Sequence, residues 1–277
     1  MKKKIAILGS TGSIGTTSLN IFKKNKNKFD IILLAANRNY SLICKQIKVF
    51  KPKYYIISDE LVFKKVKKKY KNTKIKIYNN FSDLNFKKKK FDITISSIVG
   101  IAGLSPTIKF VKYSKKILLA NKETIICGWH LIKNLSRSHK TKIIPVDSEH
   151  FSIDQLTRNY KDTDIEKIYL TASGGPFLNK PLKSFKSIKA SDAIKHPKWK
   201  MGKKISIDSS NLMNKVLEII EAYRLFPFKI DKYEIIIHPQ SLVHAIVHFK
   251  NGQTRFLYHE TDMKIPISNA IFENDFD

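Results

Sequence analysis

The segment Gly9-Ser10-Thr11-Gly12-Ser13-Ile14-Gly15 constrains the fold of this chain more than any other feature. It follows a four-residue apolar run at 5–8 and precedes a helical pattern at 17–24. Such a run is typical of a buried parallel strand, and the glycines permit a tight turn into the helix. Backbone N–H groups at that helix N-terminus can bind a pyrophosphate. The spacing is GxxGxxG and not the commoner GxGxxG, so a purely structural turn stays open as an alternative.

Apolar runs alternate with helical patterns through the first half of the chain. Helices are expected at 17–24, 42–50 and 60–70, and strands at 5–8, 31–36, 54–57, 74–78, 93–96, 116–119 and 142–146. This alternation predicts a doubly wound α/β fold with a parallel sheet. We therefore predict a first, dinucleotide-binding domain over 1–146.

The pattern changes in the second half of the chain. A strand at 167–171 leads into a glycine turn, and Ser209-Ser210 are expected to cap one long helix over 210–226. Strands at 234–237, 243–250 and 254–259 are expected to pair antiparallel, with a hairpin at Asn251-Gly252. We predict an α+β catalytic and metal-binding domain over 147–277 with a mostly antiparallel sheet.

The composition limits the classes of partner. The chain has 277 residues and a formal net charge of +29, yet only five of its 52 basic residues are arginine and the lysines are spread throughout. Nucleic-acid interfaces favour the planar fork of arginine on one face. We predict a solvated basic surface, with nucleic-acid binding as a distant alternative. The positive field favours phosphorylated ligands.

Neither the cysteines nor the apolar segments suggest a secreted or membrane protein. Cys44 and Cys127 are too few for a disulfide framework and lack metal-site spacing. The first apolar run is too short for a secretory signal, and no segment approaches the roughly 18 apolar residues of a membrane span. We expect a cytoplasmic protein without membrane contact.

The end of the second predicted strand indicates which dinucleotide is bound. An NAD site usually has an acidic residue there, which holds the ribose 2′-hydroxyl. This chain has Asn37-Arg38-Asn39 instead, and a guanidinium suits a 2′-phosphate. The sequence therefore favours NADP(H).

Three carboxylates form the candidate metal centre. Asp147 and Glu149 are two residues apart, so in an extended segment their side chains point the same way. Glu218 follows Asn214 and Lys215 on one polar stripe of the predicted helix. Such a stripe is more often a solvent-facing surface, and that alternative stays open. Oxygen donors without cysteine or clustered histidine predict Mg²⁺ or Mn²⁺ rather than Zn²⁺.

Hydroxyl and ammonium groups near these carboxylates are candidates for binding an anion. Ser173 precedes Gly174-Gly175, Ser209 is expected at a helix start, and Lys215 can add charge. The segment 196–202, with His196 and Trp199, is expected to form a mobile aromatic flap that excludes water from the site. A structural role is the alternative for His196.

In this order, the motifs resemble the 1-deoxy-D-xylulose 5-phosphate reductoisomerase family from residue 5 to about residue 267. The motifs that carry the resemblance are GSTGSIG at 9–15, LLANKE at 118–123, PVDSEH at 145–150, SGGPF at 173–177, HPKWKMGKKISID at 196–208, MNKVLE at 213–218 and HPQS at 238–241. The family moves the carbon skeleton of 1-deoxy-D-xylulose 5-phosphate and reduces the resulting aldehyde with NADPH, giving 2-C-methyl-D-erythritol 4-phosphate for isoprenoid biosynthesis.

The resemblance implies a homodimer and a role for each matching residue. NADPH contacts are implied for Thr11, Gly12, Ser13, Ile14, Asn37, Arg38, Asn39, Asn121, Glu123 and Gly202. Asp147, Glu149 and Glu218 are implied to be the ligands of a divalent cation, either Mg²⁺ or Mn²⁺, with Co²⁺ as a further choice. Contacts to the phosphosugar are implied for Ser148, Glu149, Ser173, His196, Ser209, Asn214, Lys215 and Glu218, with Ser173, Ser209, Asn214 and Lys215 at its phosphate. Catalytic roles are implied for Lys122, Asp147, Glu149, His196 and Glu218.

The sequence departs from the family's pattern in two ways. Asn37, Ala172 and Val216 stand where glycine is usual, and Val216 is the one expected to crowd a nearby backbone. The family's C-terminal helical domain is expected to be missing, so a remnant that binds NADPH without turnover is one alternative. A semialdehyde dehydrogenase is a weaker alternative, since neither cysteine has the context of a nucleophile.

Overall fold

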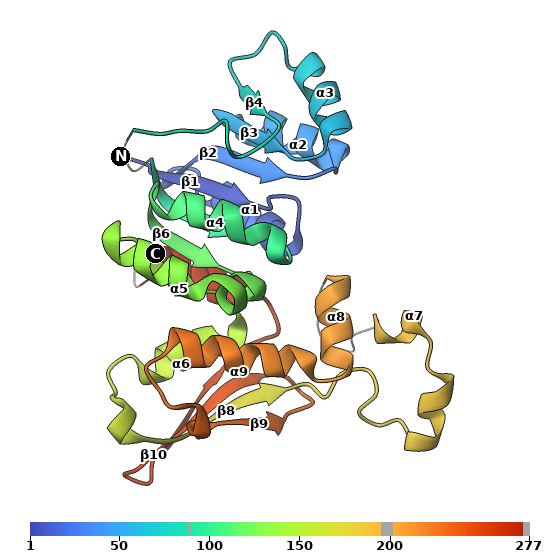
Figure 1. Cartoon of the computed structure of the whole chain (residues 1–277), viewed down its shortest axis with the longest axis vertical. Helices are drawn as coiled ribbons and strands as arrows, with labels where there is room; N and C mark the ends of the chain where they lie inside the picture. The colour runs from blue at the N-terminus through green and yellow to red at the C-terminus, as the bar shows by residue number, and fades with distance from the viewer. Residues whose placement is uncertain (88–89, 195–201, 274–277) are drawn as a thin grey trace. The chain divides into compact units, whose positions relative to one another are not determined.

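The computed structural model describes residues 1–87, 90–194 and 202–273, which form two compact units (Figure 1). The first unit is Met1–Val146 together with Ile267–Asp277, and the second is Asp147–Pro266. The domain predicted over 147–277 thus differs from the second unit at its C-terminal end, because the chain returns to the first unit at Ile267. The return of the chain has an apolar cause: Ile267 and Ile271 are buried, and the rings of Phe272 and Phe29 lie 5.6 Å apart.

The first unit contains a parallel sheet of seven strands in the order β4-β3-β2-β1-β5-β6-β7. Its strands are β1 (Lys3–Leu8), β2 (Phe29–Ala36), β3 (Tyr54–Ile57), β4 (Lys76–Tyr78), β5 (Phe91–Ser96), β6 (Ser114–Leu119) and β7 (Lys142–Pro145). In β1 the residues from Ile5 to Leu8 are completely buried, as expected for a central strand covered on both faces. The predicted parallel α/β fold is confirmed.

Helices connect these strands. They are α1 (Ser13–Lys24), α2 (Tyr40–Phe50), α3 (Glu60–Lys69), α4 (Leu104–Val111) and α5 (Lys122–Ser138). A further helix, α10 (Lys264–Phe272), begins in the last residues of the second unit and continues in the first. Three-residue 3₁₀ turns lie at Ile101–Gly103, Asp162–Asp164 and Ile230–Lys232, and a longer one at Leu182–Ser187. Over the described residues, none of the helices has both the length and the hydropathy needed to cross a bilayer.

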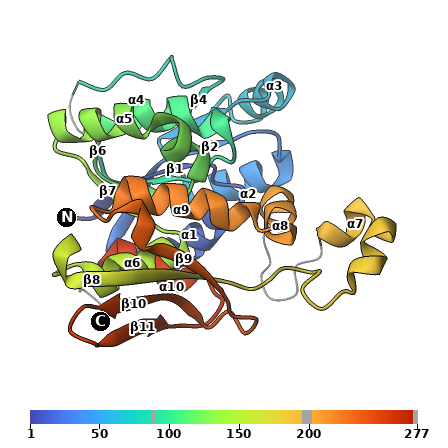
Figure 2. The ribbon, with the colours of Figure 1, turned by 60° about the horizontal axis from the view of Figure 1, so that its bottom comes forward.

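The second unit contains a four-stranded sheet in the order β11-β10-β8-β9. Its strands are β8 (Ile165–Ala172), β9 (Tyr233–Ile237), β10 (Val243–Phe249) and β11 (Thr254–Tyr258). Figure 2 shows the predicted hairpin of β10 and β11, in which Gly252 has a φ of 82°. The expectation for β9 was wrong, because it pairs with β8 in parallel. The helical connection between these strands returns the chain to the end of the sheet from which β8 began.

Over the described residues, the helices that lie wholly within this unit are α6 (Ser148–Thr157), α7 (Ala190–Ala193), α8 (Lys203–Ser210) and α9 (Met213–Leu225). The single helix predicted over 210–226 is wrong at its start, since α8 and α9 are separate helices (Figure 1). Leu212 has a φ of 61°, a left-handed conformation that no α-helix continues through. Ile153 of α6 and Ala222 of α9 share one buried apolar cluster with the sheet, so both helices are fixed to it.

Candidate active site

The glycine turn after β1 is shaped by its own backbone at two positions. Gly9 has a φ of 93°, and a Cβ there would lie 2.6 Å from the carbonyl oxygen of Ser97. A Cβ at Gly15 would collide with the carbonyl oxygen of Gly9. Gly12 differs, because it is exposed and a Cβ there would make only an ordinary contact at 3.4 Å. The outer glycines therefore make the turn, and the middle one leaves its outer surface open to a ligand.

A buried hydrogen-bond network holds this turn against α2. The Gln46 side chain donates to the backbone carbonyl of Ser10 at 2.8 Å and accepts from the Ser10 hydroxyl at 2.8 Å. The Tyr55 hydroxyl also donates to Gln46, at 2.7 Å, and burial raises the pKa of Tyr55. Sequence reasoning missed Gln46 and Tyr55, since neither belongs to a nucleotide-binding motif.

The candidate NADPH residues fall into separate groups. Thr11, Gly12, Ser13 and Ile14 lie at the N-terminus of α1, and Asn37, Arg38 and Asn39 lie exposed between β2 and α2. Asn39 also caps α2 by accepting from Leu42 N at 3.1 Å. Gly202 belongs to the second unit, as the N-cap of α8.

Residues at the start of α5 are buried or half-buried. The Asn121 side chain accepts from Thr124 N at 2.7 Å and donates to the carbonyl of Gly100 at 2.9 Å, so it organises its own turn. Glu123 is half-buried, and Lys122 is buried with 9% exposure. Lys122 lies in the first unit, away in sequence from the carboxylates of the second.

Asp147 and Glu149 reach the candidate metal centre from a helix start. Asp147 is the N-cap of α6 and accepts from Ser148 N at 3.0 Å, and Glu149 lies in the first turn. The expected extended segment is therefore wrong, and the helix brings the two carboxylates together by a different geometry. The Ser148 hydroxyl donates to Glu149 Oε2 at 2.5 Å, which orients that carboxylate.

The polar stripe of α9 faces the interior of the second unit. Asn214, Lys215, Glu218 and Glu221 are buried. The apolar residues Met213, Val216 and Tyr223 are instead exposed by 46%, 46% and 52%. The solvent-facing alternative for this stripe is thus wrong.

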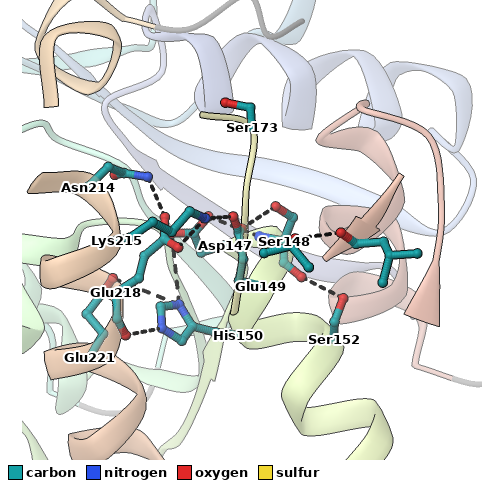
Figure 3. A network of polar contacts seen from close by, with 12 residues as sticks. Asp147, Ser148, Glu149, His150, Ser152, Ser173, Asn214, Lys215, Glu218 and Glu221 are labelled. Atoms are coloured by element: carbon teal, nitrogen blue, oxygen red, sulfur yellow. Dashed lines mark hydrogen bonds and ion pairs between the residues drawn. The ribbon is translucent and has the colours of Figure 1, made fainter. Parts of the chain in front are cut away.

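Three carboxylates meet where α6 and α9 approach each other (Figure 3). Asp147, Glu149 and Glu218 each offer an oxygen, and these atoms lie within 4.8 Å of one another. Glu218 is only 1% exposed, and Asn214 Nδ2 donates to its Oε1 at 2.5 Å. Oxygen donors of this kind, at this spacing, suit a hard divalent cation such as Mg²⁺ or Mn²⁺.

The ammonium of Lys215 contacts two of these carboxylates. It donates to Glu149 Oε1, and to Glu218 Oε2 at 2.6 Å. Burial opposes the charged form, but the carboxylates of Glu149 and Glu218 outweigh burial and hold the pKa of Lys215 above its usual value. Lys215 is therefore a charged group inside a nearly closed polar cluster.

His150 and Glu221 join the cluster, and sequence reasoning missed both. His150 Nε2 lies 2.9 Å from the carbonyl oxygen of Glu218, while its Nδ1 lies 3.9 Å from both Asp147 Oδ2 and Glu221 Oε2. Asp147, His150 and Glu221 could also supply three donors to a cation. The all-carboxylate set matches Mg²⁺ better, and a histidine beside a ligand is typical of a residue that orients it. The sequence could have indicated both residues, because His150 follows Asp147 and Glu221 follows Glu218 at the three-residue spacing of one helix face.

The turn after β8 brings two candidate phosphate ligands together. Gly174 and Gly175 have φ values of 83° and 72°, and a Cβ at Gly175 would lie 2.5 Å from the carbonyl oxygen of Ser209. Ser173 therefore lies on a turn that packs against Ser209. Ser209 is at the end of α8, which corrects its expected position at a helix start. His196 and Trp199 lie outside the described residues.

Comparison with protein families supports this description. Residues 5–128 match the model of 1-deoxy-D-xylulose 5-phosphate reductoisomerase, and residues 143–226 match the model of its C-terminal domain. The enzyme of that name from Pelagibacter ubique is 51% identical over 98% of this chain and 71% of its own length. The enzyme from Wolbachia pipientis wMel is 44% identical over 97% of this chain and 69% of its own length.

Two solved structures share the fold closely. A 1-deoxy-D-xylulose 5-phosphate reductoisomerase in complex with NADPH, fosmidomycin and magnesium is 34% identical, with a TM-score of 0.90, over 97% of this chain and 69% of that one. The Zymomonas mobilis enzyme in complex with NADPH is 33% identical, with a TM-score of 0.88, over 98% of this chain and 70% of that one. The chain belongs to the 1-deoxy-D-xylulose 5-phosphate reductoisomerase family.

Proposed function

We propose that this chain carries out its family's reaction, the NADPH- and cation-dependent conversion of 1-deoxy-D-xylulose 5-phosphate into 2-C-methyl-D-erythritol 4-phosphate. The observation that supports this most is the buried convergence of Asp147, Glu149 and Glu218. Ser148, Asn214 and Lys215 hold two of these carboxylates, Glu149 and Glu218, in place. Family membership supplies the substrate.

The second unit holds the divalent cation in this proposal. Asp147, Glu149 and Glu218 are its ligands, with His150 and Glu221 keeping the Asp147 carboxylate in position. Mg²⁺ is the first choice, because a related structure contains it, and Mn²⁺ or Co²⁺ are further choices. A bound cation supplies a Lewis acid for the carbonyl and hydroxyl oxygens of the sugar.

The first unit binds NADPH in this proposal. The N–H groups at the start of α1, beside the exposed Gly12, receive the pyrophosphate. Arg38, exposed after β2, pairs with the 2′-phosphate, with Asn37 and Asn39 beside it. Asn121, Glu123 and Gly202 are proposed as further contacts of NADPH.

The sugar phosphate is assigned to side chains around the carboxylates. Ser173, Ser209, Asn214 and Lys215 bind the phosphate end, where hydroxyl and ammonium donors match its oxygens. Ser148 and Glu149 bind the hydroxyl end, while Lys122 and His196 complete the catalytic set. A homodimer and a cytoplasmic location remain predictions for this chain.

The direct test follows NADPH absorbance in the presence of 1-deoxy-D-xylulose 5-phosphate and Mg²⁺ or Mn²⁺. Oxidation should require the cation and stop when a chelator removes it. Glu149→Gln should abolish turnover and spare NADPH affinity, because it changes a ligand in the second unit alone. Glu166→Gln, at an exposed position of β8, is the matched control and should leave turnover unchanged. NADPH binding without turnover by the unaltered chain would contradict the proposal and favour a non-catalytic remnant.

A further inference from the structure

We propose that Lys215 acts as an internal counter-ion for the metal centre, which the divalent cation displaces when it binds. The inference rests on the proposed metal site and adds a second role for one of its residues. Its consequence is that binding of the cation makes the Lys215 ammonium available to the phosphate of the substrate.

The first step of the argument is that the ammonium and the cation need the same oxygen atoms. Lys215 Nζ bridges Glu149 Oε1 and Glu218 Oε2, with 2.6 Å to the latter. A Mg²⁺ ligand distance is about 2.1 Å, so a cation on these two oxygens would lie almost on top of the ammonium. The cation and the Lys215 ammonium would then repel each other strongly, because both are positive and the site is buried. Occupation by one therefore excludes the other.

The second step concerns how Lys215 stabilises the carboxylates of Glu149 and Glu218 while no cation is bound. Glu149 and Glu218 are buried with 9% and 1% exposure, and ionised groups at such depth need a positive partner. Lys215 provides that partner from the preceding turn of α9, three residues before Glu218. The ion pair keeps the ligands ionised and correctly placed before the cation arrives. The same ion pair must be broken for the cation to enter, which weakens apparent cation affinity.

The third step follows from the position of Lys215 on its helix. Its neighbour Asn214 is also buried and also contacts Glu218. Both of these residues, which are proposed to bind the phosphate, therefore contact a proposed metal ligand when no cation is bound. A cation on Glu218 Oε2 displaces Lys215, whereas the hydrogen bond of Asn214 is to the other oxygen, Oε1. The free ammonium is then a partner for a phosphate dianion, so metal and phosphosugar should favour each other's binding.

Lys215→Met separates these roles, because it keeps most of the length of the side chain and removes its charge. Mn²⁺ affinity without substrate, measured from the electron paramagnetic resonance of free Mn²⁺, should increase about tenfold, a typical coupling between sites. The KM for 1-deoxy-D-xylulose 5-phosphate at saturating Mn²⁺ should rise in the same variant. Opposite changes of these two affinities are the expected result, whereas a merely structural lysine would weaken both.

Controls keep the test decisive. Lys167→Met removes another ammonium of the second unit, which pairs with Glu234 at 2.5 Å on the surface, and should leave Mn²⁺ affinity unchanged. If Lys215→Met is too unstable for titration, the rise of its melting temperature with Mn²⁺ should exceed that of the wild type. Equal or weaker Mn²⁺ binding by Lys215→Met would overturn the inference and leave the proposed function standing. Absence of Mn²⁺ binding by the wild type would overturn both.

Discussion

His150 Nε2 lies 2.9 Å from the backbone carbonyl oxygen of Glu218, and this hydrogen bond joins the first turn of α6 to the middle of α9. A carbonyl oxygen only accepts, so Nε2 carries the proton and donates. The opposite ring nitrogen, Nδ1, then faces Asp147 and Glu221 at 3.9 Å. One imidazole thus holds together the two helices that supply the three candidate metal ligands.

His150→Phe should therefore weaken metal binding without affecting NADPH. The ring volume is kept, but the donor to Glu218 and the nitrogen beside Asp147 are lost. Changes beside metal ligands typically cost about 10- to 100-fold in affinity, and we expect a loss in that range for Mn²⁺. Titration of Mn²⁺ by electron paramagnetic resonance and of NADPH by fluorescence would measure both. His248→Phe, in β10, is the control; unchanged Mn²⁺ affinity in His150→Phe would refute the orienting role.

Gln46→Leu should weaken the NADPH-binding unit. Its side chain donates to the Ser10 carbonyl and accepts from Tyr55, and leucine leaves both groups without this partner. A buried polar group left unsatisfied costs about 1–3 kcal/mol, so urea unfolding should show a loss of that size. NADPH affinity should fall too, since the turn after β1 loses its support. Gln155→Leu, at an exposed position of α6, should change neither quantity.

A stacked pair of histidines should make stability depend on pH. The His244 and His259 rings lie 3.8 Å apart at an interplanar angle of 17°. Burial, and then the neighbouring His259, lower the pKa of His244 to about 4, and burial also lowers the pKa of His259. The unfolded chain, with histidine near pKa 6.5, therefore binds more protons than the folded chain between these values.

The expected result is that the free energy of unfolding is highest above about pH 6.5 and falls as the pH drops toward about 4. His244 contributes on the order of 3 kcal/mol to that loss, from the size of its shift. Urea unfolding at about pH 7 and about pH 5 should show a smaller difference for His244→Leu than for the wild type. His130→Leu, at an exposed position of α5, should keep the wild-type difference. An equal difference in both variants would contradict the contribution of His244 to the pH dependence.

Local patterns were enough to predict much of the first unit. The fully apolar run from Ile5 to Leu8 indicated a strand buried on both faces, and Gly9 and Gly15 indicated a turn that only glycine can make. The hairpin at Gly252 followed from the same kind of argument. These features depend on neighbours in the sequence, because periodicity and backbone sterics act over a few residues.

The second unit was less predictable where distant segments decide the outcome. The parallel pairing of β9 depends on where α8 and α9 return the chain. The helix break at Leu212 could not be predicted from a glycine or proline, because neither residue type occurs at that position. The helical stripe of α9 could equally have faced solvent, because its residue types fit either environment.

The sequence by itself determined the parallel sheet of the first unit, the turn that suits a dinucleotide and the acidic residues available to a cation. Only the tertiary structure decided that Glu218 faces Asp147 and Glu149, with Lys215 and His150 packed among them. The physical reason is that burial is set by the packing of α6 and α9 on a common sheet, a contact between segments almost 70 residues apart (68 between His150 and Glu218) that no local pattern encodes.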